Sequence, residues 1–101
     1  MSKPDFTKLI FDIETIVKKW EDHLTKDDWV YISIYQKLSE PFIEKWNNEL
    51  DWYEISRYQI LSEPFIEKWK NKLSWFWVSA NQTLSEPFIE KWNNELDCGA
   101  I

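Results

Sequence analysis

The feature that most constrains this chain is a nine-residue stretch, Leu-Ser-Glu-Pro-Phe-Ile-Glu-Lys-Trp, that occurs three times without a change. The copies begin at Leu38, Leu61 and Leu84, so the period is 23 residues. A fixed period of about 20 to 50 residues is typical of stacked repeats, in which each unit buries its apolar face only against its neighbours. We therefore predict an all-α protein: a short α-solenoid of three two-helix repeats preceded by an N-terminal capping helix.

The period also divides the chain. We expect a capping helix and linker over residues 1–28, repeats over 29–51, 52–74 and 75–97, and a terminal tail over 98–101. Apolar residues recur at helical spacing from Phe6 to Leu24, which predicts one amphipathic helix over residues 5–24. Residues 25–28 would then link this helix to the first repeat.

Each repeat is expected to form two short helices, both marked by residues that favour a helix start. A proline in the first turn of the second helix disturbs no intrahelical hydrogen bond. The candidate N-cap residues are Asp28, Asp51 and Ser74 for the first helices, and Ser39, Ser62 and Ser85 for the second. The predicted helices span 29–36 and 40–50, 52–59 and 63–73, and 75–82 and 86–96. Helices of about eight to eleven residues are marginal alone in water, so stacking must stabilise them.

Several side chains recur at the same position of every repeat. The polar ones could form a ligand-binding ladder, but we interpret them as internal groups that bind loop backbone, because buried polar groups need partners. They are Ser33, Ser56 and Ser79, and Gln36, Gln59 and Gln82. The recurring tryptophans could bind an aromatic or cationic ligand, but their spacing beside Ile and Leu predicts core positions. They are Trp29, Trp52 and Trp75, and Trp46, Trp69 and Trp92.

The positions that differ between copies lie on the opposite side of the first helix, and many of them are aromatic. Tyr, Trp and Arg are enriched where proteins bind one another, whereas a face exposed only to water would carry Lys, Glu and Gln. We therefore predict a partner-binding face formed by Tyr31, Ile34, Tyr35, Tyr53, Arg57, Tyr58, Phe76 and Trp77. The alternative is that these side chains pack sideways between successive first helices.

Composition excludes several classes of partner. The net charge of −6 disfavours nucleic acid and anionic membranes, and no apolar run approaches the roughly 18 residues of a membrane span. One histidine, His23, and one cysteine, Cys98, cannot form a metal site of several His and Cys ligands. No nucleophile–base constellation is evident, so we expect no enzyme activity, no cofactor and no small-molecule substrate. A cytoplasmic protein is expected because the first residues do not form a signal peptide.

The repeat unit Trp-x-x-Ile-Ser-x-x-Gln-x-Leu-Ser-Glu-x-Phe-Ile resembles tandem repeats in proteins of giant DNA viruses of the mimivirus group. The resemblance covers residues 29–97 and carries no catalytic residues across. This chain differs in its three copies, in Pro41 and its equivalents, and in Cys98, which stands where a fourth unit would begin with Trp. Recent duplication and an engineered consensus sequence would both produce such near-perfect copies.

Two functions are compatible with these patterns. In the first, the chain is a non-enzymatic scaffold that binds another protein or a peptide through the variable face. In the second, it is a structural or self-assembling array whose last repeat pairs with a second copy, because terminal repeats without a polar outer face expose apolar surface.

Overall fold

The chain is elongated and all-α, with principal dimensions of 50 × 22 × 21 Å. The structure, a computed structural model, describes residues 2–96; the predicted tail over 98–101 and the end of the third repeat at Asp97 lie outside them. Within the described residues, all regular secondary structure is helical. The elements are α1 (Ile13–Trp20), the 3-10 helix η1 (Glu21–His23), α2 (Lys26–Tyr35), α3 (Glu40–Lys45), α4 (Trp52–Tyr58), α5 (Glu63–Lys68), α6 (Trp75–Asn81) and α7 (Glu86–Lys91).

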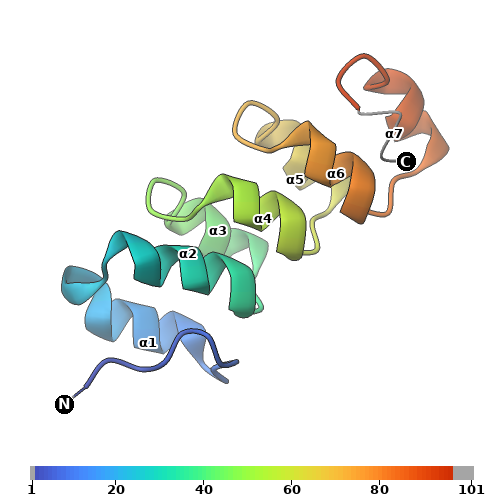
Figure 1. Cartoon of the computed structure of the whole chain (residues 1–101). Helices are drawn as coiled ribbons and strands as arrows, with labels where there is room; N and C mark the ends of the chain where they lie inside the picture. The colour runs from blue at the N-terminus through green and yellow to red at the C-terminus, as the bar shows by residue number, and fades with distance from the viewer. Residues whose placement is uncertain (1, 97–101) are drawn as a thin grey trace.

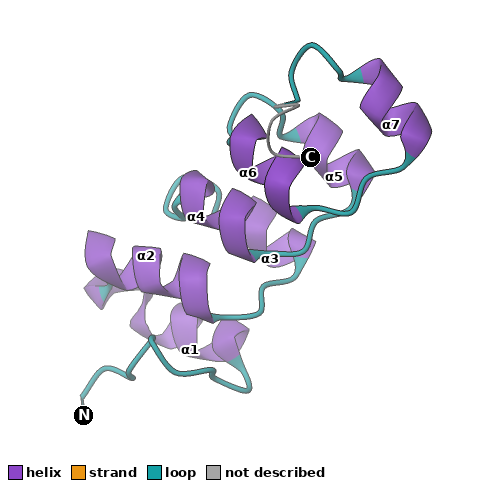
Figure 2. Cartoon of the chain, turned by 45° about the vertical axis from the view of Figure 1, so that its right-hand side comes forward, coloured by secondary structure: helices purple, strands orange, loops and turns teal. Residues whose placement is uncertain are grey.

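The helices form two rows. The first helices of the repeats, α2, α4 and α6, pack side by side along the molecule, and the second helices, α3, α5 and α7, form a parallel row behind them (Figures 1 and 2). Helix α1 lies at the N-terminal end, next to α2 (Figure 1). The predicted all-α fold of stacked helix pairs is therefore confirmed.

A continuous apolar core runs between the rows. The same repeat positions supply it in every copy, because each helix turns one apolar face inward. The first helices contribute Ile32, Ile55 and Val78, the second helices contribute Phe42, Phe65 and Phe88, and the loops contribute Leu50, Leu73 and Leu96, all buried. Since each buried side chain of this size contributes about 1.5–3 kcal/mol, contacts between repeats rather than helix propensity stabilise the fold.

The starts of the second helices agree with the prediction, but their ends do not. The hydroxyl of Ser62 accepts the amide of Phe65 and Pro64 lies in the first turn, as in the other two copies. However, these helices end at Lys45, Lys68 and Lys91 rather than at residues 50, 73 and 96. In the first repeat, the indole Nε1 of Trp52 donates to the carbonyl of Asn47 at 2.8 Å. That carbonyl belongs to the stretch predicted to continue the helix, and it is used instead to hold the next repeat.

The N-terminal segment differs most from the prediction. The expected helix over 5–24 is wrong for its first half: residues 5–12 form short turns and irregular backbone. Helix α1 spans only Ile13–Trp20, and the carboxylate of Asp12 before it accepts the amide of Thr15. The reason is that the side chain of Gln36 binds the backbone of Phe6, Lys8 and Ile10, which a helix would use internally.

The start of the first repeat also needs correction. Helix α2 begins at Lys26 rather than after Asp28, because Thr25 and Asp28 form a reciprocal capping box. The stretch predicted as a linker is therefore the first turn of a longer helix. Asp28 also accepts a 2.6 Å hydrogen bond from Lys3, which ties the N-terminal segment to this turn.

Candidate protein-interaction surface

A ladder of polar side chains on the inner face of the first helices determines which side of these helices faces outward. Gln59 donates from Nε2 to the carbonyls of Ser33 and Gln36, at 2.9 and 2.7 Å, and accepts the amide of Leu38 at 3.1 Å. It therefore binds three backbone groups of the preceding repeat. Gln82 repeats two of these bonds one unit later, and Gln36 makes their equivalents to the N-terminal segment.

The recurring serines form a second ladder that points the other way. Ser33 Oγ donates to the carbonyl of Trp29 and accepts the amide of Asp51, the N-cap residue of α4 in the next repeat. Ser56 accepts the amide of Ser74 in the same way. The interpretation of these Ser and Gln side chains as internal groups is confirmed, which removes them as candidates for a ligand-binding ladder.

The recurring tryptophans also pack within the fold. In each repeat the two rings lie against each other, with centroids 5.3 Å apart for Trp29 and Trp46, and 5.2 Å apart for Trp52 and Trp69. Trp29 is buried, and the others are half-buried at the edge of the core. Their prediction as core residues is therefore confirmed for Trp29, and the other five rings pack against the edge of the core.

Most aromatic side chains of the predicted partner-binding face lie at the surface. The inner ladders fix the rotation of α2, α4 and α6, so the variable positions point away from the core. The exposed fractions run from 41% to 51% for Tyr31, Tyr35, Tyr53, Tyr58 and Phe76. Large apolar side chains gathered on one surface are characteristic of interaction sites on proteins.

One aromatic residue of this predicted face, Trp77, packs across the contact between neighbouring repeats. Trp77 is half-buried; its ring meets that of Tyr53 edge-on, at 6.0 Å between centroids, and lies 4.6 Å from the guanidinium of Arg57. Ile34 is half-buried as well. Sideways packing between first helices, the alternative considered from the sequence, therefore applies to Trp77.

Sequence reasoning missed a groove at the C-terminal ends of α2 and α4. It has a volume of ≈ 460 Å³ and lies between Tyr35 and Tyr58, with Leu9 and Ile60 on its walls. Ile60 is 93% exposed and Leu9 is 63% exposed, both unusual for aliphatic side chains. One signal was present: at the linker position where the other repeats carry Lys37 and Thr83, the middle repeat carries Ile60.

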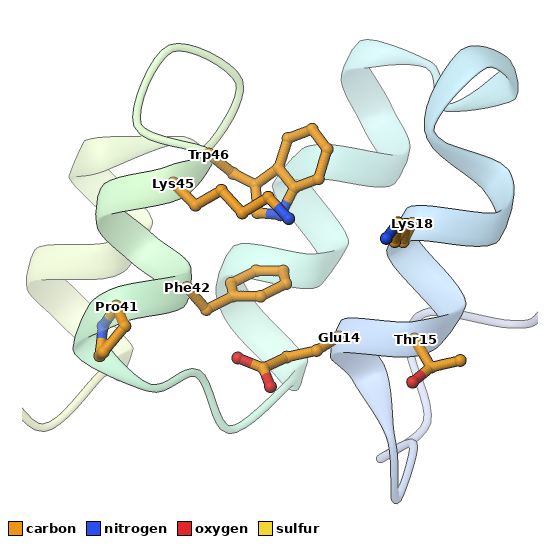
Figure 3. Close-up of a pocket in the computed structure, with 7 residues that line it drawn as sticks. All are labelled: Glu14, Thr15, Lys18, Pro41, Phe42, Lys45 and Trp46. Atoms are coloured by element: carbon orange, nitrogen blue, oxygen red, sulfur yellow. The ribbon is translucent and has the colours of Figure 1, made fainter.

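A second groove separates the capping helix from the first repeat (Figure 3). Phe42 and Trp46 extend from α3 toward α1, and Glu14 and Lys18 extend from α1. Glu14 accepts a hydrogen bond from Ser39, as Glu40 does from Ser62 one unit later. Lys18 and Lys45 both line this groove, so α1 supplies a lysine where the later contacts carry the glutamate of a Glu–Lys pair.

Two carboxylates have pKa values below their usual ones because they accept hydrogen bonds within the fold. Burial raises the pKa of Asp28, but hydrogen bonds from Lys3 and from Thr25 outweigh it and hold this pKa below its usual value. Hydrogen bonds from Lys91 and then from Trp92 lower the pKa of Glu67. Both groups are thus ionised structural partners near neutral pH. Within residues 2–96, no group of three or more His, Cys, Asp or Glu side chains is placed to hold a metal ion.

Comparisons with known proteins do not indicate a function, so a functional proposal must rest on the surface of the molecule. No family model, no curated protein and no solved structure matches the chain. The resemblance to giant-virus repeats therefore stays a prediction. None of the helices in the described part of the chain has the length and apolar character needed to cross a membrane.

Proposed function

We propose that this chain is a non-enzymatic helical-repeat protein that binds another protein through the outer faces of α2, α4 and α6. The observation that carries the proposal is the set of half-exposed aromatic side chains on these faces. Aromatic residues supply large contact areas with few rotatable bonds, which is why they dominate binding energy at protein interfaces.

The groove between Tyr35 and Tyr58 lies within this surface and can receive part of a partner. Its walls are mostly apolar, and Ile60 and Leu9 project beside it. We propose that it receives an apolar side chain of the partner, since binding energy concentrates where a large side chain fills a pocket. The guanidinium of Arg57 lies 4.9 Å from the ring of Tyr58 and is exposed, so it would orient the partner by a charged contact.

Photocrosslinking can test this placement. A photoreactive phenylalanine analogue at Ile60 is expected to capture a protein partner, whereas the same analogue at Lys45, on the row of second helices, is expected to capture none. The captured protein is then purified, and its affinity is measured by calorimetry for the unaltered chain and for a triple variant, Tyr31→Gln, Tyr35→Gln and Tyr58→Gln.

The expected result is a loss of affinity of at least about tenfold in the triple variant, with unchanged helical circular dichroism. Trp77 is left out of this variant because it joins α4 to α6. An affinity that stays the same in the triple variant, or crosslinks formed only from Lys45, would place the binding surface elsewhere and overturn the proposal.

A further inference from the structure

The contact between successive repeats is asymmetric, because one side supplies mainly hydrogen-bond donors and the other mainly acceptors. Toward the preceding repeat, each unit presents mainly donors: Gln59 Nε2, the amide and hydroxyl of Ser62, and the ammonium of Lys68. Toward the following repeat, each unit presents mainly acceptors, which are backbone carbonyls and two glutamates. Glu40 accepts both bonds from Ser62, and Glu44 pairs with Lys68 at 2.9 Å.

The next contact repeats this arrangement with the same polarity. Ser85 donates its amide and hydroxyl to Glu63, and Lys91 pairs with Glu67 at 3.0 Å. Gln82 donates to the carbonyl of Gln59 at 2.7 Å. The donor side and the acceptor side of a repeat are therefore different surfaces that fit each other, as in a head-to-tail interface rather than a two-fold one.

The acceptor side of the third repeat carries the same groups without these partners. Glu86 and Glu90, the counterparts of Glu63 and Glu67, are exposed and bind no donor among residues 2–96. Ile89 is half-buried, whereas its counterpart Ile66 is fully buried beneath the following repeat. This face thus reproduces the surface that the internal contacts cover.

Charge decides which occupant fits. Two acceptor sides placed together would bring glutamates against glutamates, because the lysines of α5 and α7 point back toward the preceding repeat. Like charges across an interface are unfavourable, so direct pairing of two third repeats, the homodimer considered from the sequence, is disfavoured. A donor side offers the complementary charges and hydrogen-bond donors.

We propose that the acceptor side of the third repeat, formed by α6 and α7, docks the donor side of another repeat of this type, carried by a second polypeptide. The partner must present a Gln at the end of one helix, a Ser three residues later and a Lys six residues after that Ser, as Gln59, Ser62 and Lys68 do. The glutamates that mark this docking surface, Glu86 and Glu90, are not part of the predicted aromatic face.

The probe is a synthetic peptide with the sequence of residues 51–74, titrated into the ¹⁵N-labelled full chain. We expect amide shifts concentrated at Gln82, Leu84, Glu86 and Glu90, and binding that weakens as salt is added. A peptide with Gln59→Ala should bind at least about tenfold more weakly, because it leaves the paired backbone groups unsatisfied.

A charge exchange tests the direction of the contact. A peptide with Lys68→Glu should bind the unaltered chain about two- to fivefold more weakly, the size expected for one exposed ion pair. The same peptide should regain that affinity with a full chain carrying Glu90→Lys, a substitution at an exposed position that leaves folding intact.

A free peptide loses conformational entropy when it binds, which weakens binding, so a tethered version is tested as well. The same sequence is joined after Ile101 by a flexible Gly-Ser linker, which raises its effective concentration to the millimolar range. Amide shifts at α6 and α7 in the free or the tethered experiment, together with the charge exchange, support the proposal. Absence of these shifts in both experiments, or shifts confined to α2 and α4, overturns it.

Discussion

Gln59 shows how one side chain orders two repeats at once. It is buried and binds two carbonyls and one amide of the preceding unit. Each of these backbone groups has lost its water, so removing the amide side chain leaves them without compensation. This makes the inner face of α4 intolerant of substitution, whereas the outer face is free to vary.

Replacement of this glutamine by an apolar side chain of similar length tests its role. Gln59→Met is expected to lower the free energy of unfolding by more than about 2 kcal/mol, because an unsatisfied buried polar group costs about 1–3 kcal/mol. Gln82→Met is the matched control: Gln82 is half-buried and makes two such bonds, so its loss should be smaller. Urea denaturation of both variants measures the difference, and equal losses would contradict the ladder.

Asp28 links the charge state of one residue to the stability of the N-terminal end. Its pKa is held below the usual 3.8 in the folded chain, so folding favours the carboxylate. The stabilisation is present above pH 3.8 and is lost as the pH falls through the folded pKa. Thermal denaturation between pH 5 and pH 2 should therefore show a steeper loss in the unaltered chain than in Asp28→Asn. Parallel curves would show that Lys3 does not stabilise the carboxylate.

At the scale of elements, α1 takes the place of a second helix although its sequence does not repeat. Glu14 binds Ser39 as Glu40 binds Ser62, so α1 supplies one of the two glutamate contacts. The second is missing: Lys18 lines the same groove as Lys45, where the later contacts pair a glutamate with a lysine. The cap is thus less complementary than the internal contacts.

Lys18→Glu should supply the missing pair. We expect it to stabilise the chain by about 0.2–1 kcal/mol, the range for an exposed ion pair, with part of the gain from removing a like charge. A double-mutant cycle with Lys45→Ala, followed by urea denaturation, separates this interaction from the change in net charge. A gain that persists in full when Lys45 is alanine would mean that the two side chains do not interact.

The sequence predicted the helices of the repeats better than those of the N-terminal segment. Inside the array the period specified the helix pairs, the caps at Ser39, Ser62 and Ser85, and the buried faces, because each copy repeats the same local signals. Outside it, apolar spacing predicted a helix over 5–24, but Gln36 captures the backbone at Phe6 to Ile10. Such a long-range bond leaves no local pattern in either segment.

The sequence likewise predicted only part of the candidate site. Variation between copies predicted the exposed aromatic face, and the structure places Tyr31, Tyr35, Tyr53, Tyr58 and Phe76 at the surface. The variation left open whether these side chains pack sideways between first helices, as Trp77 does against Tyr53, and it did not predict that Leu9 from the N-terminal segment lines the groove beside Ile60. Which side chains pack sideways, and what lines the groove, depends on how neighbouring units stack, and comparing the copies does not decide this.

At the scale of the whole molecule, stability should depend on the apolar packing of the helix pairs. Trp69 packs against Trp52 and Phe65 in the middle repeat. Trp69→Ala should lower the free energy of unfolding by about 2–4 kcal/mol, near the lower end for aromatic truncation because the side chain is half-buried. Phe11→Ala is the control, since Phe11 is fully exposed and should change little. Equal urea midpoints for both variants would contradict this packing as the main source of stability.

The central claim is that the inner ladders hold the fold, so that the outer aromatic face is available for a partner. Urea denaturation of the triple variant Tyr31→Gln, Tyr35→Gln and Tyr58→Gln tests it most directly. We predict a single cooperative transition and a loss of less than about 2 kcal/mol in total, as expected for surface substitutions. Loss of the cooperative transition would contradict the account, because it would make these side chains part of the core.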